Sequence, residues 1–252
     1  MTKLWSPICE RLGIENPIFG FAHDVEAVAA ITNAGGYGVY GATRRFPHEI
    51  KEELAAIRKL VGDKAFGVDL VLPPGMPEQN SREAIEAEIP EEHKAFVEKL
   101  IDKFQVPAAT QPGMRTRFIR STEIEEEQIQ AVLDSSVDMF ACGIGAPAHV
   151  MKAAKARGKT TLALIGSPHH VQRAIDAGVE ILVAQGYDAG AHTGPIGTYS
   201  LVPQIVDAAG DTPVLVAGGV ATGRHIAAAL AMGAQGVWMG TAWLLSKEHQ
   251  GH

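Results

Sequence analysis

Short apolar segments rich in β-branched residues alternate along the chain with longer segments whose apolar residues recur at helical spacing. The short segments are continuously apolar, which is typical of strands covered on both faces and therefore of a parallel sheet. The predicted strands are Pro17–Gly20, Tyr37–Tyr40, Ala65–Val71, Asp138–Cys142, Thr160–Ile165, Glu180–Ala184, Pro213–Ala217 and Gly236–Met239. The predicted helices between them include residues 48–60, 147–157, 169–177, 201–209 and 222–232. A strand–helix unit repeated about eight times predicts an α/β protein, a closed (β/α)8 TIM barrel, with an open doubly wound sheet as the alternative.

Residues 73–135 are the first departure from this alternation, because they are too long for one crossover between strands. We expect an acidic helix over Ser81–Phe104, an irregular segment at Thr110–Gly113 and a second helix over Glu123–Leu133. We interpret residues 73–135 as an insertion after the third strand, on the catalytic face of a single domain formed by residues 1–252.

The last residues are the second departure. After the strand Gly236–Met239, residues 241–252 are too few for a full eighth helix, so we expect a truncated or incomplete one. Such a barrel leaves one flank of its sheet uncovered. Either the sequence is a shortened one, or another subunit covers the gap, as in a homodimer.

Composition and charge exclude several classes of protein. With 46% hydrophobic and 20% charged residues, the chain is too apolar to be disordered. Its net charge of -7 and the lack of a basic cluster argue against binding to nucleic acid or to an anionic membrane surface. Cys9 and Cys142 are too few for a disulfide framework, Glu10 and Arg11 interrupt any signal peptide, and no apolar run approaches the ~18 residues of a membrane helix. We therefore expect a cytoplasmic protein of enzyme size.

The segment Gln185–Gly194, which follows the sixth predicted strand, carries the first candidate site. Its small residues let the backbone approach a large flat ligand closely. His192 has no residue of its own size beside it in this segment. We therefore interpret His192 as a functional group, the alternative being a histidine that only stabilises the turn.

Two glycine turns follow the seventh and eighth predicted strands. Val216–Arg224 contains Gly218 and Gly219 before a predicted helix, and Met239–Thr241 again places a glycine before a hydroxyl group. Free amides at such turns favour a phosphate, and barrels that bind phosphate hold it after strands 7 and 8. Neither G-x-x-x-x-G-K-[ST] nor a first-turn G-x-G-x-x-G occurs, which argues against an NTPase and a Rossmann dinucleotide site.

Together, Gln185–His192, Pro213–Gly219, Gly236–Thr241 and the early segments Pro17–Gly20 and Asn33–Gly38 resemble the nitronate monooxygenase family, formerly called 2-nitropropane dioxygenases. The wider flavin-barrel superfamily also contains enoyl reductases and quinone reductases. The resemblance implies that the chain binds FMN and oxidises alkyl nitronates or nitroalkanes with O2, with His192 as the catalytic base and no metal. The residues that it implies for FMN are Gly20, Phe21, Ala22, Asp69, Gln185, Gly186, Gly190, Gly218, Gly219, Gly240 and Thr241, the last four for the phosphate.

Three residues depart from the pattern of that family. Asp188 and Ala191 stand where it more often has Glu and Gly, and Asp69 stands where relatives commonly have Asn. A carboxylate beside a flavin would resist its reduced anion. These departures bear on activity more than on fold or cofactor.

Two other functions stay open at this point. One is a flavin reductase that takes electrons from NAD(P)H and reduces a quinone or an enoyl thioester. The other is a flavin-binding but inactive or truncated barrel. We interpret Cys142 as a buried, inert residue, with a nucleophile as the alternative. His169, His170 and His225 do not form a ligand set for a metal, and we interpret them as solvated or helix-capping residues.

Overall fold

The computed structural model describes residues 4–76, 81–110 and 118–250. Parallel strands close into a barrel in the order β1 to β8, with β8 pairing with β1. The strands are β1 (Ile18–Ala22), β2 (Tyr37–Gly41), β3 (Gly67–Val71), β4 (Met139–Ile144), β5 (Thr160–Ile165), β6 (Ile181–Gln185), β7 (Val214–Ala217) and β8 (Gly236–Met239). The predicted TIM barrel is confirmed, and every predicted strand overlaps an observed one.

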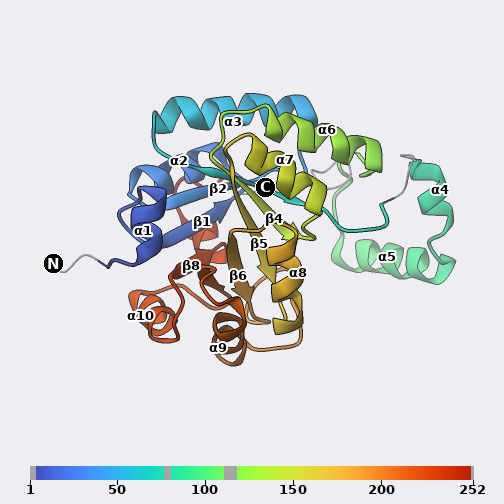
Figure 1. Cartoon of the computed structure of the whole chain (residues 1–252). Coiled ribbons are helices and arrows are strands. Elements are labelled where there is room, and N and C mark those ends of the chain that lie inside the picture. The colour runs from blue at the N-terminus through green and yellow to red at the C-terminus, as the bar shows by residue number, and fades with distance from the viewer. Residues whose placement is uncertain (1–3, 77–80, 111–117, 251–252) are drawn as a thin grey trace. The chain divides into compact units, whose positions relative to one another are not determined.

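Helices surround the strands of the barrel (Figure 1). They are α2 (Val25–Asn33), α3 (Pro47–Val61), α7 (Ala148–Ala156), the short 3-10 helix η1 (Pro168–His170) with α8 (Val171–Asp176), α9 (Thr198–Ala209) and α10 (Gly223–Ala231). The structure adds α1 (Pro7–Leu12), which the apolar pattern did not predict. Local signals for α1 were present, because Pro7 occupies its first turn and Gly13 ends it in the left-handed conformation with φ 67°.

The interior of the barrel is a core of its own, formed by every second residue of the strands. Its buried members are Ile8, Cys9, Phe19, Tyr37, Val39, Met139, Ala141, Leu162, Ile181, Val183, Leu215, Ala217 and Trp238. Ile8 and Cys9 belong to α1, so this helix closes the end of the barrel where the strands begin. A second, larger core lies between the sheet and the outer helices. The opposite end, where the strands finish, is called the barrel mouth below.

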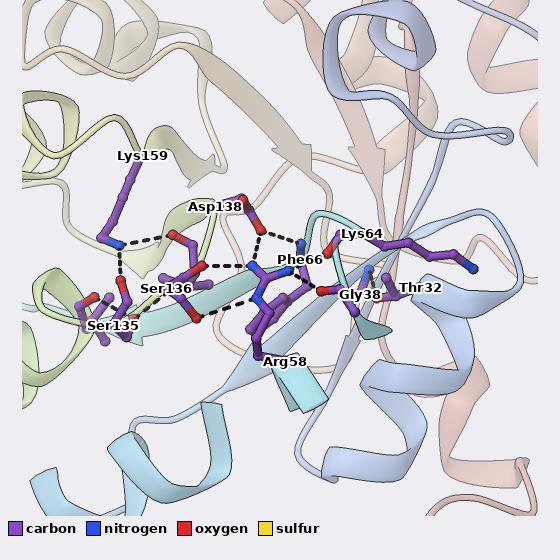
Figure 2. Close-up of polar contacts among 12 residues, drawn as sticks. Thr32, Gly38, Arg58, Lys64, Phe66, Ser135, Ser136, Asp138 and Lys159 are labelled. Carbon is purple, nitrogen blue, oxygen red and sulfur yellow. Dashed lines mark hydrogen bonds and ion pairs between the residues drawn. The ribbon is translucent and has the colours of Figure 1, made fainter. Parts of the chain in front are cut away.

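Polar side chains hold the closed end together at the starts of β3, β4 and β5 (Figure 2). Arg58 of α3 donates a hydrogen bond of 2.6 Å to the Oδ2 atom of Asp138, and the same oxygen accepts the N–H of Phe66 at 3.1 Å. Lys159 is buried, and its Nζ donates to the carbonyl of Val137 at 3.0 Å. Burial lowers the pKa of Lys159. This network satisfies backbone groups that close packing removes from water.

The chain forms two compact units. The larger unit consists of residues 1–74 and 128–252 and contains the barrel, and the smaller unit consists of residues 75–127. The smaller unit contains α4 (Arg82–Ala87), α5 (Glu91–Phe104) and the first residues of α6 (Thr122–Leu133). A location of the insertion on the catalytic face stays a prediction.

The prediction of one acidic helix over residues 81–104 is wrong, because α4 and α5 are separate helices. Pro90 lies immediately before α5. Proline has no N–H group to continue a helix, but it is well tolerated where one begins. Of the irregular segment predicted at residues 110–113, all but Thr110 lies outside the described residues.

After β8, the described part of the chain contains only a short 3-10 helix, η2 (Thr241–Leu245). This agrees with the expected incomplete eighth helix. A cavity of about 260 Å³ lies on this flank, between α2 and the segment after β8. Ala27 and Ile31 of α2 and Trp243 line it. None of the described helices is both long enough and apolar enough to cross a membrane.

Candidate functional site

The predicted site residues lie at the end of the barrel where the strands finish, but their Cβ directions differ. Phe21 belongs with the interior core, and its ring stacks on Trp238 with centroids 5.8 Å apart. Gly20 faces outward, because a Cβ built there would lie 2.5 Å from Ile31 Cδ1. Ala22 is also part of the outer core. Of these three residues, only Phe21 directs its side chain into the barrel mouth.

The loop between β6 and α9 carries His192 and is held at its base. Asp188 accepts a hydrogen bond of 2.8 Å from the N–H of Thr198, the first residue of α9. This hydrogen bond from the Thr198 backbone lowers the pKa of Asp188. A Cβ on Gly186 would lie 2.3 Å from the Thr198 nitrogen, so no other residue fits there without a backbone shift. His192 itself is exposed.

The turns after β7 and β8 meet this loop. A Cβ on Gly218 would lie 3.2 Å from the backbone nitrogen of Ala189, and a Cβ on Gly190 would lie 3.1 Å from Thr241 Oγ1. Gly218 and Gly219 have φ angles of 110° and 70°, which only glycine adopts readily. The structure thus brings the predicted phosphate turns and the His192 loop onto one rim.

The backbone amides at these turns are available to a ligand. Within the described residues, the N–H groups of Gly218, Gly219, Gly240 and Thr241 donate no hydrogen bond to another part of the chain. The N–H groups of Ala221 and Thr222 instead donate to the ring nitrogen Nδ1 of His225, at 3.0 and 3.2 Å. His225 therefore caps α10, as expected. The unpaired amides fit an anion such as a phosphate, because each would otherwise need a water molecule as its partner.

Asp69 is a buried ionisable group of the site. It lies in β3 opposite Gly41 of β2 and Ala141 of β4, and only 4% of its surface is exposed. Its Oδ1 atom has no hydrogen-bond partner. Burial raises its pKa to about 7, although a hydrogen bond from the N–H of Gly143 opposes the shift. An unpartnered carboxyl oxygen at the mouth of the barrel fits a polar atom of a bound ligand.

His23, which the sequence analysis did not single out, lies next to these residues. It follows β1, its Nδ1 lies 2.9 Å from the carbonyl oxygen of Gly41, and its ring meets Phe21 edge-on at 5.0 Å. The sequence feature that could have identified His23 as a site residue is its position directly after the first strand. Cys142, in contrast, is fully buried in the outer core and does not reach the mouth, so the structure supports the inert interpretation.

Comparisons with known proteins point to one family. The model of the nitronate monooxygenase family matches residues 7–252. A putative monooxygenase of Mycobacterium tuberculosis is 40% identical over 254 residues, which cover 96% of this chain and 66% of that protein. A probable nitronate monooxygenase of Staphylococcus aureus is 30% identical, over 96% of this chain and 68% of its own length.

Solved structures give the same picture of the fold. A nitroalkane oxidase from Streptomyces ansochromogenes superposes with a TM-score of 0.75 at 25% identity, covering 96% of this chain and 69% of its own. FabK from Thermotoga maritima superposes with a TM-score of 0.74 at 24% identity, covering 99% of this chain and 65% of its own, and it supports the fold alone. The chain therefore spans about two thirds of the length of the relatives that it matches.

Proposed function

Because this chain belongs to the nitronate monooxygenase family, we propose that it is a flavin-dependent oxidoreductase that binds FMN and oxidises alkyl nitronates or nitroalkanes with O2. The observation that carries the proposal is the rim formed by the two glycine turns and the loop between β6 and α9. There, unpaired amides, a buried carboxyl group and an exposed histidine lie on one end of a closed barrel.

The phosphate of FMN would bind to the amides of Gly218, Gly219, Gly240 and Thr241. These N–H groups need acceptors, and a phosphate offers several negatively charged oxygens to them. Gly186 and Gly190 would let the flat ring approach the backbone, with Phe21, Asp69 and Gln185 around it. Gly20 and Ala22 would contribute backbone atoms only, since their Cβ positions face the outer helices.

His192 would act on the substrate. When the substrate is a neutral nitroalkane, the imidazole of His192 removes the proton on the carbon beside the nitro group. When the substrate is a nitronate already formed, the same imidazole orients the anion. The hydrogen bond from Thr198 to Asp188 holds the loop of His192 against the glycine turns during this step. When bound, the flavin supplies the electron transfer and the reaction with O2, which no side chain can provide.

The absorption spectrum of the purified protein tests the proposal. A protein that has been loaded with FMN is mixed with propyl nitronate in the absence of oxygen, and in parallel with NADPH. Bleaching by the nitronate but not by NADPH is the expected result. Rapid bleaching by NADPH would contradict it in favour of a reductase, and a yellow protein that responds to neither would contradict it in favour of an inactive barrel.

The proposed phosphate site has a separate test. Riboflavin has the ring of FMN but no phosphate, so it should bind much more weakly if the glycine turns hold that group. Equal dissociation constants for riboflavin and FMN would exclude the turns as a phosphate site.

A further inference from the structure

One carboxyl oxygen of Asp69 is buried without a hydrogen-bond partner in the folded chain. The carboxyl group is nine-tenths or more buried, and Oδ1 is without a partner. On β4, Gly143 has no side chain beside the carboxyl group, whereas the position that a Cβ of Gly41 would take on β2 is filled by the rings of His23 and Phe21, 2.6 Å away. A Cβ on Gly143 would lie 3.2 Å from Asp69 Oδ2. The glycine at position 143 therefore makes room for the carboxyl group of Asp69. The Oδ1 atom of that group remains available to a hydrogen-bonding atom of a ligand.

The charged surroundings of Asp69 do not favour its ionised form. The titratable side chains on the neighbouring elements include those of His23 after β1, Tyr37 and Tyr40 on β2, Arg44 and Arg45 before α3, and Cys142 on β4. Burial and the hydrogen bond from the N–H of Gly143 are what shift the pKa of Asp69, and no charged side chain is among the causes. Arg45 bonds to Tyr40 and Glu53 on the outside of the barrel. A buried carboxylate without a cation is costly, and protonation relieves that cost.

The protonated acid can do what the ionised form cannot. A carboxylate only accepts hydrogen bonds, whereas a carboxylic acid also carries one O–H donor. The edge of a flavin ring that bears its carbonyl groups consists mostly of acceptors. An uncharged Asp69 would therefore donate to it in the way that the amide of an asparagine does.

We propose that Asp69 binds the flavin as a neutral carboxylic acid that donates a hydrogen bond to an acceptor of the ring, so that flavin affinity depends on one proton held by this residue. The inference rests on the proposed function, since it takes the flavin as the ligand. The neutral acid makes flavin affinity depend on pH, which an asparagine at this position would not do. Raising the pH through the titration of Asp69 removes the donor and leaves a buried negative charge against the ring.

The first test measures the dissociation constant of FMN between pH 5.5 and 9 by quenching of flavin fluorescence. For the wild-type chain, the dissociation constant should stay constant below about pH 6.5 and rise by up to tenfold per pH unit above about pH 7. Asp69→Asn keeps a donor and should bind as tightly as the wild type at low pH, without that rise. Asp211→Asn, an exposed change just before β7, is the matched control and should keep the wild-type profile.

The second test needs no flavin and no activity. Infrared spectra of the flavin-free protein at pH 6 should contain the C=O band of a protonated carboxylic acid, which Asp69→Asn removes and Asp211→Asn keeps. Should Asp69→Asn fail to fold, calorimetry of FMN binding to the wild type in two buffers of different ionisation enthalpy measures proton uptake directly. At pH 8 it should approach one proton per flavin.

The outcomes separate this inference from the proposed function. The role of Asp69 would be overturned if the wild type and Asp69→Asn bound FMN tightly with the same pH profile, or if the affinity of the wild type for FMN rose with pH. Either result would leave the proposed function as a flavoprotein standing. No FMN binding by the wild type at any pH would overturn both.

Discussion

The carboxylate of Asp188 accepts the backbone N–H of Thr198 at 2.8 Å, and this bond ties the loop of His192 to the first turn of α9. Asp188→Ala removes the acceptor and should release residues 186–197. Faster hydrogen exchange in that loop, with unchanged exchange in the strands, is the expected result. Because the pKa of Asp188 is lowered in the folded chain, the bond should also weaken as the pH falls through that lowered value. Exchange in the loop that is identical in the variant and the wild type would show that the bond does not hold it.

Gly218→Ala should abolish flavin binding. The new Cβ would lie 2.4 Å from Thr198 Oγ1, at a φ of 110° that an alanine adopts only with strain. We expect a colourless protein with a loss of stability of about 1–3 kcal/mol in urea unfolding. Gly223→Ala is the control, since nothing lies within 4 Å of a Cβ there, and it should stay yellow. Retention of FMN by Gly218→Ala would place the phosphate elsewhere.

His192→Asn should keep its yellow colour and lose most of its turnover of neutral nitroalkane, by about 100-fold or more if the imidazole is the base. Turnover of a nitronate prepared in advance should fall less, because no proton then has to be removed. Oxygen consumption with both substrates measures the difference. His48→Asn, exposed on α3, controls for the loss of any imidazole. Equal rates for His192→Asn and the wild type would remove His192 from the mechanism.

Asp69 should also make the flavin-free protein less stable as the pH rises. Its pKa is about 7 when folded and 3.8 for the ordinary group, so between these values the folded state holds a proton that the unfolded state has released. The free energy of unfolding therefore falls over this range and the loss is complete above about pH 7, on the order of 2–4 kcal/mol. Asp69→Asn should lack this dependence and be more stable than the wild type at pH 8. Urea unfolding at pH 5 and pH 8 measures both, and parallel pH dependences would contradict the buried, neutral acid.

Lys159→Met tests the closed end of the barrel without touching the rim. It leaves the carbonyl of Val137 without a donor, which should lower the free energy of unfolding by about 1–3 kcal/mol. The affinity for FMN should not change, because Phe66, Asp138 and Lys159 directly precede β3, β4 and β5, whereas the glycine turns follow β7 and β8 at the other end of the parallel strands. A large loss of FMN affinity in a folded Lys159→Met protein would contradict this separation of stability from binding.

Local patterns were sufficient for the barrel but not for every helix. Continuous apolar runs such as Thr160–Ile165 predicted strands correctly, because burial on both faces demands that composition. The prediction of a single acidic helix over residues 81–104 is wrong, because α4 ends at Ala87 and Pro90, which has no N–H group, precedes a separate helix α5. The short helix α1 was missed, although Pro7 and Gly13 marked its two ends.

The sequence by itself determined the parallel barrel and the glycine turns after β7 and β8, because each depends on residue types at short spacing. It also singled out His192 as a candidate functional residue, whose role as the base stays a prediction from the resemblance to the family. Only the tertiary structure decided which side chains face the barrel mouth. Gly20 and Phe21 are neighbours in β1, yet one faces the outer helices and the other the interior, since successive residues of a strand point to opposite faces. Only the fold also shows that Asp69 is buried with an unpartnered oxygen, because that environment is made by β2 and β4, whose residues are distant in the chain.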